Sequence, residues 1–217
     1  MTVIAVDGPA ASGKGTIARA LAAHYGLPYL DTGLLYRAVG HTLVQAHGDP
    51  ENEQDALSAC TFDESLLENP ALQGEGAGRI ASIVSAHPLV RAALIQRQRQ
   101  FAQRAGGAVL DGRDIGTVIA PDADAKLFVT ATPMTRAKRR HGEMRKAGGT
   151  MSYNAVLGDI RARDRRDMGR ASAPLVQAAD ADLLDTSFLS IDAAVQRAIA
   201  LVDARILRNA SGESTGS

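Results

Sequence analysis

The residues with the clearest chemical pattern form a glycine-rich stretch near the start of the chain. Gly8, Gly13 and Lys14 have the spacing of a phosphate-binding P-loop. In such a loop backbone N–H groups surround a polyphosphate, the next helix directs its positive end at the anion, and the lysine adds a mobile cation. The pattern predicts a nucleoside triphosphate site made of Gly8, Pro9, Ala10, Ala11, Ser12, Gly13, Lys14, Gly15 and Thr16.

A second polar group follows the next apolar segment, residues 29–30. Thr32, Tyr36 and Arg37 lie at the start of a helical pattern. Arg37 falls one turn into that helix, where a guanidinium can hold a phosphate with two hydrogen bonds. The alternative is an ordinary helix cap, supplied by Asp31 or Thr32, beside a solvated arginine.

Two carboxylates and a guanidinium follow a third apolar segment within four residues, as Asp111, Arg113 and Asp114. Ligands of open α/β sheets bind outside the carboxyl ends of the strands. Charges packed so closely at a strand end are costly unless they face a polar cleft. A contribution to the site is therefore predicted, and an ion-paired strand end is the alternative.

A fourth group, Arg163, Asp167 and Arg170, repeats at intervals of four and three residues. Such spacing places the three side chains on one face of a helix. A solvated, ion-paired face is the alternative. The other arginines within 161–170, and a glycine pair at 148–149 that would serve as a hinge, favour a segment that closes over a site.

The elements that must position these groups alternate along the chain. Apolar runs predict strands at 2–6, 29–30, 108–111, 125–129 and 181–185. Amphipathic patterns predict helices at 14–25, 34–47, 79–86, 89–105, 133–147, 153–167 and 191–208. The predicted fold class is therefore α/β, a parallel β-sheet flanked by helices.

This alternation is interrupted once. We expect a core formed by residues 1–48 and 106–208, with a short lid at about 148–170. Residues 49–105 would form an inserted lobe, whose part at 50–77 is polar and lies at the surface. The Ser/Gly-rich tail, 209–217, is expected to be disordered.

Composition excludes several other classes. The 24 basic and 24 acidic residues give a formal net charge of zero, and aromatic residues make up 4%. Nucleic-acid-binding proteins are usually more basic, or present aromatic platforms, so no nucleic acid is expected as a partner. The single cysteine, Cys60, excludes an intramolecular disulfide and a multi-cysteine metal site. The chain shows no signal-peptide pattern and no apolar run of membrane-spanning length, so we expect a cytoplasmic enzyme without a membrane partner.

With these groups assembled, the chain resembles the bacterial cytidylate kinases, a family of nucleoside monophosphate kinases, over residues 2–207. The Gly-Lys-Gly-Thr ending of the P-loop is typical of such kinases. The blocks that carry the resemblance lie at 7–16, 30–37, 111–118, 163–167 and 173–175. The resemblance implies a P-loop kinase fold, an inserted lobe that binds the monophosphate, and a monomer. It also implies ATP-dependent, Mg²⁺-assisted phosphorylation of CMP and dCMP.

Individual roles also follow from the resemblance. Lys14, Arg113, Arg163 and Arg170 would be catalytic, and Arg136 would bind ATP together with the P-loop. Mg²⁺ would be carried mainly by the nucleotide and water, with Thr16 nearby and no protein metal site. The acceptor nucleotide would be bound by Thr32, Tyr36, Arg37, Ser82, Arg91, Asp114, Arg163, Asp167 and Arg170.

Within that set, Asp114 would accept a hydrogen bond from the amino group of cytosine. Uracil presents a carbonyl there, so CMP and dCMP should be preferred to UMP. The chain departs from the family in its lobe, because many members carry a longer insertion with a small antiparallel sheet. They also often have Arg-Thr where this chain has Gln73-Gly74. These departures bear on specificity more than on the reaction.

Two other classes of protein remain as alternatives. Another P-loop kinase of a small metabolite, of the shikimate or gluconate type, would share the loop but lack the blocks at 111–114 and 163–170 together. A non-catalytic P-loop nucleotide-binding regulator would more often show a basic surplus or an altered Lys14, and the chain has neither.

Overall fold

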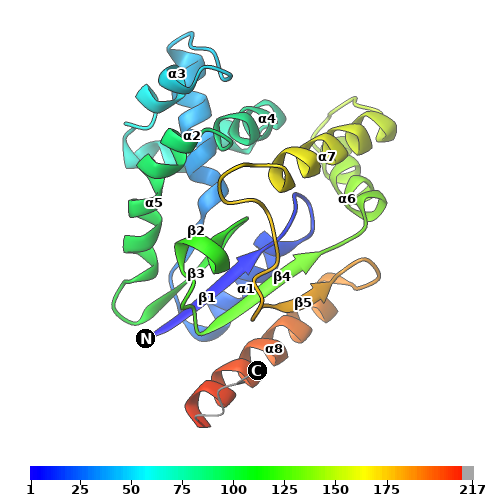
Figure 1. Ribbon diagram of the computed structural model, residues 1–217. Coiled ribbons are helices and arrows are strands. Elements are labelled where there is room, and N and C mark those ends of the chain that lie inside the picture. Colours follow the sequence, from blue (N-terminus) through cyan, green and yellow to red (C-terminus); the bar gives the residue numbers. More distant parts are fainter. Residues whose placement is uncertain (212–217) are drawn as a thin grey trace.

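The predicted alternation of strands and helices is confirmed in the computed structural model, which describes residues 1–211 (Figure 1). The strands are β1 (Thr2–Asp7), β2 (Tyr29–Asp31), β3 (Gly107–Gly112), β4 (Ala125–Thr130) and β5 (Asp182–Asp185). The helices are α1 (Lys14–Tyr25), α2 (Thr32–Gln45), α3 (Glu53–Ser58), α4 (Glu75–Val84), α5 (Pro88–Ala102), α6 (Pro133–Lys146), α7 (Tyr153–Met168) and α8 (Ile191–Ser211).

The strands form one parallel sheet in the order β2-β3-β1-β4-β5. Strand β1 is central, and its last residue, Asp7, pairs in register with Gly112 of β3. On the other side of β3, Asp31 of β2 pairs with Asp111. Parallel pairing therefore gathers the carboxyl ends of β1, β2 and β3 at one edge, where polar groups of three distant segments meet.

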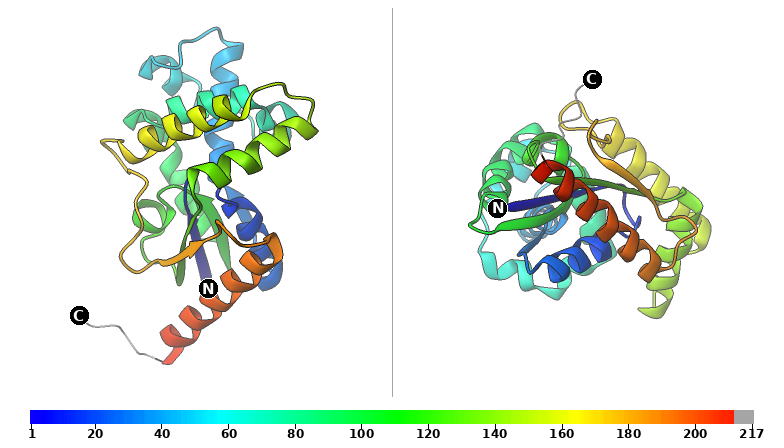
Figure 2. Two further views of the ribbon diagram at one scale, coloured as in Figure 1. Left: turned by 90° about the vertical axis from the view of Figure 1, so that its right-hand side faces the viewer. Right: turned by 90° about the horizontal axis from the view of Figure 1, so that it is seen from below.

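Alternating side chains of the central strand bury opposite faces of the sheet. Ile4 and Val6 pack into an apolar cluster with α1 and α8, which cover one face. Val3 and Ala5 point the other way, toward Ala102 at the end of α5 and the segment after β3. The result is a helix–sheet–helix sandwich, in which α8 runs along the side of the sheet away from α2–α5 (Figure 2).

Helices α2–α5 gather on the far side of the predicted cleft and share a second apolar cluster (Figure 1). Leu35 and Val39 of α2 pack there against Val84 of α4 and Leu94 of α5. The stretch 50–77, expected to be a polar surface part of the lobe, contains α3 and two 3₁₀ turns, Glu64–Glu68 and Pro70–Gln73. Helix α2, which belongs to the expected core, shares this cluster with helices of the expected inserted lobe; the domain division stays a prediction.

Helices α6 and α7 pack against each other above the P-loop, through Ala137, Met144, Val156 and Ile160 (Figure 2). Gly148 follows α6 with φ 84°, a left-handed conformation that favours glycine. The glycine pair thus forms the turn between the two helices.

The structure differs from the sequence expectations at the end of the chain and after β3. The tail was expected to be disordered from residue 209, yet α8 continues to Ser211, and the Asn209 amide donates to the Asp124 carbonyl at 2.9 Å. The remainder, 212–217, lies outside the described residues. The π-helical turn Ile115–Ile119 after β3 was not predicted, because a five-residue turn leaves no periodic pattern. None of the helices within residues 1–211 has the length and hydropathy needed to cross a membrane.

Candidate functional site

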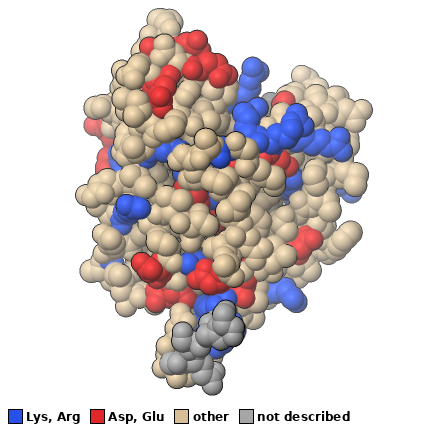
Figure 3. All heavy atoms as spheres, in the orientation of Figure 1, with Lys and Arg blue, Asp and Glu red and all other residues tan. Residues whose placement is uncertain are grey.

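A cleft of about 880 Å³ opens at the carboxyl edge of the sheet. The P-loop forms its floor, the start of α2 and the end of β3 form one wall, and α4 and α7 cover it. A smaller cavity of about 300 Å³ lies behind the same loop, bounded by α6 and the start of α8. Basic side chains gather over α7 where it approaches α4 (Figure 3). The molecule is neutral, but its cleft is strongly cationic.

The P-loop has the backbone that phosphate binding requires. Gly8 has φ 154°, and a Cβ there would overlap the carbonyl oxygen of Val129. Gly13 is left-handed with φ 92°, and no side chain caps the first N–H groups of α1. The hydroxyl of Ser12 is buried without a hydrogen-bond partner among the described residues. Orphan donors converging on a helix N-terminus fit a bound anion.

Lys14 projects from this loop into the cleft, where its Nζ lies 3.7 Å from Asp111 Oδ1. Burial lowers the pKa of Lys14, and the Asp111 carboxylate opposes that shift. The Tyr29 hydroxyl donates to the other carboxylate oxygen at 2.8 Å. Asp111 therefore holds the lysine in place while no phosphate is bound.

The position of Gly15, between Lys14 and Thr16 at the end of the loop, leaves little room for a side chain. A Cβ at this position would lie 3.1 Å from Asp111 Oδ2 and 3.8 Å from the Tyr29 hydroxyl. A side chain would crowd this corner of the cleft, so glycine keeps it open. Thr16, by contrast, lines the smaller cavity and not the cleft.

The predicted acceptor residues at the start of α2 all reach the cleft. Thr32 is buried and its hydroxyl donates to the Asp111 carbonyl at 2.7 Å, which ties the ends of β2 and β3 together. Arg37 donates to the Leu72 carbonyl at 2.9 Å. A Cβ on Gly78 of α4 would lie 3.9 Å from Arg37 Nη2, so a larger residue there would press on this cation.

Behind Tyr36, a buried ion pair joins Arg91 of α5 to Asp114. The Arg91 guanidinium also lies over the Tyr36 ring, with its central carbon 5.8 Å from the ring centroid. Ser82 is only 1% exposed and does not line the cleft, because Arg166 of α7 donates to its hydroxyl at 3.3 Å. Directly after the end of α4, Ser85 does line the cleft, and its hydroxyl accepts from Arg170 at 2.8 Å.

Asp167 is the electrostatic centre of the fourth predicted group. Its carboxylate is 1% exposed and lies 2.8 Å from Arg113 Nε, 2.7 Å from Arg170 Nη2 and 3.8 Å from Arg163 Nε. Burial opposes ionisation of Asp167, but the three arginines outweigh it and lower the pKa of this carboxyl. Burial, and then Arg113, lower the pKa of Arg163 to about 9. One carboxylate therefore lies against three cations and balances only one positive charge, so a bound phosphate could offset the remainder.

Arg136 lines neither cavity, which is also true of Gly8, Pro9, Ser82 and Asp167 among the predicted site residues. Its guanidinium is 3% exposed and donates to both carboxylate oxygens of Asp164, at 2.9 and 2.6 Å, and to the Ala10 carbonyl at 3.2 Å. It ties α7 to α6 and to the P-loop. Its predicted role in ATP binding stays a prediction.

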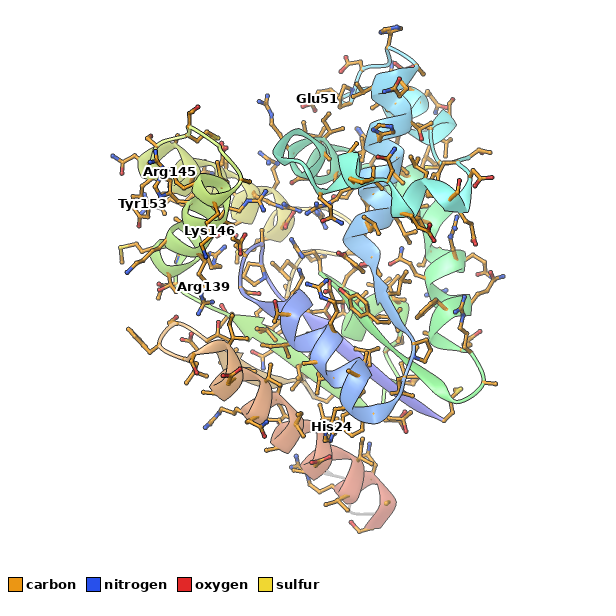
Figure 4. The ribbon with its side chains drawn as sticks, turned by 180° about the vertical axis from the view of Figure 1, so that it is seen from behind. His24, Glu51, Arg139, Arg145, Lys146 and Tyr153 are labelled. Atoms are coloured by element: carbon orange, nitrogen blue, oxygen red, sulfur yellow. The ribbon has the colours of Figure 1, made fainter. Side chains whose placement is uncertain are left out.

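Sequence reasoning missed Arg139, one turn further along α6. It donates to the Thr186 carbonyl at 2.6 Å and to the Ser12 carbonyl at 3.4 Å, and it lines the smaller cavity. Figure 4 shows Arg139 on the part of α6 nearest α8, whereas Arg145 and Lys146 lie near the far end. No signal in the sequence marked Arg139, because its partner Thr186 is distant in the chain and is brought beside it only by the fold.

Comparison with known proteins places this architecture in a family. Residues 4–204 match the sequence model of the family described as cytidylate kinase. A protein named cytidylate kinase from Xanthobacter autotrophicus (strain ATCC BAA-1158 / Py2) is 59% identical, with 94% of this chain and 98% of that protein covered. One of the same name from Bradyrhizobium sp. (strain ORS 278) is 56% identical, with 93% and 96% covered.

Among solved structures, an uncharacterised protein from Eubacterium ventriosum ATCC 27560 has a TM-score of 0.55 at 16% identity, with 94% of this chain and 99% of that chain covered. That likeness concerns the fold alone. The match over most of the chain, together with relatives above 50% identity, settles the family. The chain belongs to the cytidylate kinase family.

Proposed function

We propose that this protein transfers the γ-phosphoryl group of ATP directly to a phosphate oxygen of CMP or dCMP, which gives ADP and CDP or dCDP. The observation that carries the proposal is the convergence of two phosphate-binding groups on one cleft. Lys14 of the P-loop and the arginines Arg37, Arg113 and Arg163 line the same 880 Å³ space. Membership of the cytidylate kinase family supports the choice of acceptor.

The reaction needs no protein nucleophile, because the acceptor phosphate is already anionic at neutral pH. An oxygen of that phosphate bonds to the γ-phosphorus while the bond from that phosphorus to the bridging oxygen of ADP breaks. Lys14 and the arginines would offset the negative charge gathered between donor and acceptor. Asp111 pairs with Lys14, and Asp167 pairs with Arg113, Arg163 and Arg170, so two carboxylates position most of these cations.

Mg²⁺ held with the donor nucleotide would supply positive charge that offsets the phosphates. Within residues 1–211 no three His, Cys, Asp or Glu side chains gather as a metal-binding group. The residues fit an ion held chiefly by the nucleotide and water. Asp111, beside the space left open at Gly15, would accept hydrogen bonds from its water ligands, with Thr16 on the other side of the loop.

Base choice would rest on Asp114, which lines the cleft beside Arg91. A carboxylate there can accept from the amino group of cytosine, whereas the uracil carbonyl would leave two acceptors facing each other. The buried Ser82 would join this recognition only if Arg166 moved away, and Ser85 is the serine already at the cleft surface. We also propose that the enzyme acts as a monomer in the cytoplasm, which light scattering and cell fractionation would test.

An assay of ADP release tests the proposal directly. The purified protein receives ATP and Mg²⁺ with CMP, dCMP, UMP, AMP or shikimate. We expect efficient turnover of CMP and dCMP, and kcat/KM for UMP lower by about tenfold or more, because a mismatched buried acceptor costs roughly 1–3 kcal/mol.

The variant Lys14→Ala should lose on the order of a hundredfold or more in kcat, as removal of one charge-stabilising donor does. Lys138→Ala is the matched control, because it also removes a lysine, but one that is exposed on α6. Turnover of shikimate in place of CMP would show a metabolite kinase instead. ATP binding without turnover of any acceptor would indicate a regulator, and normal turnover by Lys14→Ala would refute the proposed chemistry.

A further inference from the structure

Asp7, the last residue of β1, joins the two halves of the cleft without lining it. It directly precedes the P-loop, yet its carboxylate points to the segment after β3. Oδ1 accepts from the Ile115 N–H and Oδ2 from the Gly116 N–H, both at 2.8 Å. Asp7 is 5% exposed, so these bonds are shielded from water. A carboxylate of the donor side thus holds the backbone that carries Asp114.

These two N–H groups are the first of the π-helical turn Ile115–Ile119. In most helices such orphan donors are satisfied by the side chain of the residue at the N-cap, where aspartate is among the strongest caps. Asp114 occupies that position, and its carbonyl accepts from the Val118 N–H at 2.9 Å. Its carboxylate, however, makes no capping hydrogen bond and pairs with Arg91 at the cleft instead.

We propose that Asp7 is a positioning residue for recognition of the acceptor base. By capping the turn from another strand, it leaves the Asp114 carboxylate, which pairs with Arg91, at the cleft where it can face the nucleotide. The inference rests on the proposed function, because it assumes that Asp114 reads the base.

The surroundings of Asp7 support a dedicated role. A Cβ on Gly116 would lie 3.4 Å from Asp7 Oδ2 and 3.1 Å from the Lys126 side chain, so the turn is held closely on both sides. Burial raises the pKa of Asp7 to about 7, although both N–H bonds and Arg113 oppose this and Asp114 adds to it. Burying a carboxylate to accept from two N–H groups has a desolvation cost. A role in keeping the Asp114 carboxylate at the cleft would account for an aspartate at this position.

The experiment compares Asp7→Asn with two other variants. Asn keeps the shape but offers one acceptor and one donor, so one N–H is left to Asp114. Asp124→Asn is the matched control, because Asp124 also accepts from a backbone N–H of β1, that of Val3 at 2.7 Å, at the opposite end of the strand. Asp114→Asn tests the base assignment itself. Calorimetry gives Kd for CMP, UMP and a non-hydrolysable ATP analogue with each protein.

For Asp7→Asn we expect the CMP Kd to rise by about tenfold or more and the preference for CMP over UMP to fall, with the ATP analogue within about twofold of wild type. Asp124→Asn should leave all three constants unchanged. Unchanged CMP binding in Asp7→Asn would overturn the inference, as would equal weakening of CMP and the ATP analogue. If Asp114→Asn also retains the wild-type preference, the base assignment fails. If Asp7→Asn retains the wild-type preference for CMP but Asp114→Asn loses it, the positioning role of Asp7 alone fails.

The wild-type protein supplies a measurement that does not depend on a variant folding. Protonation of Asp7 converts one acceptor into a hydroxyl, so the CMP preference over UMP should fall as pH is lowered from 8 to 6. Both ligands carry the same phosphate, whose titration cancels in the ratio. The charged groups facing Asp7 are Arg113 and Asp114, with the Lys126 chain packed beside Gly116. A ratio that stays constant across this range overturns the inference.

Discussion

Replacement of Asp167 by asparagine tests the electrostatic design of the cleft. The substitution keeps the shape of the side chain but removes the carboxylate that pairs with Arg113 and Arg170 and lies 3.8 Å from Arg163. Removing one partner of a buried ion pair costs about 3–5 kcal/mol, because the other charge is left uncompensated. For a protein of this size that corresponds to a fall in Tm of roughly 6–20 °C.

The same reasoning predicts that an anionic ligand rescues the variant. In Asp167→Asn the arginines lose their nearest counter-charge, so CMP should raise the Tm of the variant more than that of the wild-type protein. The pKa of Arg163, already about 9, should fall further without the neighbouring carboxylate. Thermal unfolding with and without CMP, at pH 7.5 and low salt, measures both effects.

Asp182→Asn is the control for this experiment. Asp182 also pairs with an arginine, Arg205 at 3.1 Å, but both side chains are partly solvated, and exposed pairs contribute only about 0–1 kcal/mol. Equal Tm values for the two variants would refute the idea that Asp167 holds the cluster together. So would an Asp167→Asn protein that CMP stabilises no more than wild type.

Three further outcomes follow from the packing and the charges. Gly8→Ala should destabilise the protein by several kcal/mol, because the added Cβ would overlap a backbone carbonyl. Gly158→Ala in α7, whose added Cβ would meet no atom within 4 Å, should stabilise the protein by about 0.5–1 kcal/mol. Chemical denaturation of the two variants measures both effects. Arg136→Ala should lower the free energy of unfolding by about 3–5 kcal/mol. A double-mutant cycle with Asp164→Ala should show strong coupling between the two side chains, and its absence would show that the buried pair is not formed. The folded-state pKa of Asp7 is raised, so the native state binds more protons than the unfolded state between pH 4 and 7. The wild-type protein should therefore lose stability relative to Asp7→Asn as pH rises through that range, and parallel urea titrations with no such trend would contradict this.

The helical and strand elements were predictable because their signals are local. The run at 2–6 is apolar and flanked by glycine-rich turn residues, so it could only be a buried strand before a loop, and β1 spans Thr2–Asp7. Boundaries were less accurate where capping decides them. Helix α4 begins at Glu75, four residues earlier than the apolar pattern indicated, because Gly74 forms its N-cap without any side-chain signal.

Local sequence predicted which charged residues gather at the cleft. The P-loop, Arg37, Asp111 and the arginines of α7 were recognisable from spacing, because the chemistry demands glycine at tight turns and guanidinium at phosphates. The spacing did not show which arginines face the cleft. Arg136 and Arg139 lie on the same helix three residues apart, yet only Arg139 lines a cavity, since Asp164 takes up the guanidinium of Arg136.

The tertiary structure alone decided the pairings that cross long stretches of chain. Asp7 caps a turn more than a hundred residues away, and Asp111 holds Lys14 through parallel neighbours β1 and β3. No local pattern specifies such contacts, because they depend on strand order and register, which many distant side chains set together. The sequence by itself thus determined the donor loop and the charged groups, whereas the fold decided which carboxylate holds each cation and which is left free for a ligand.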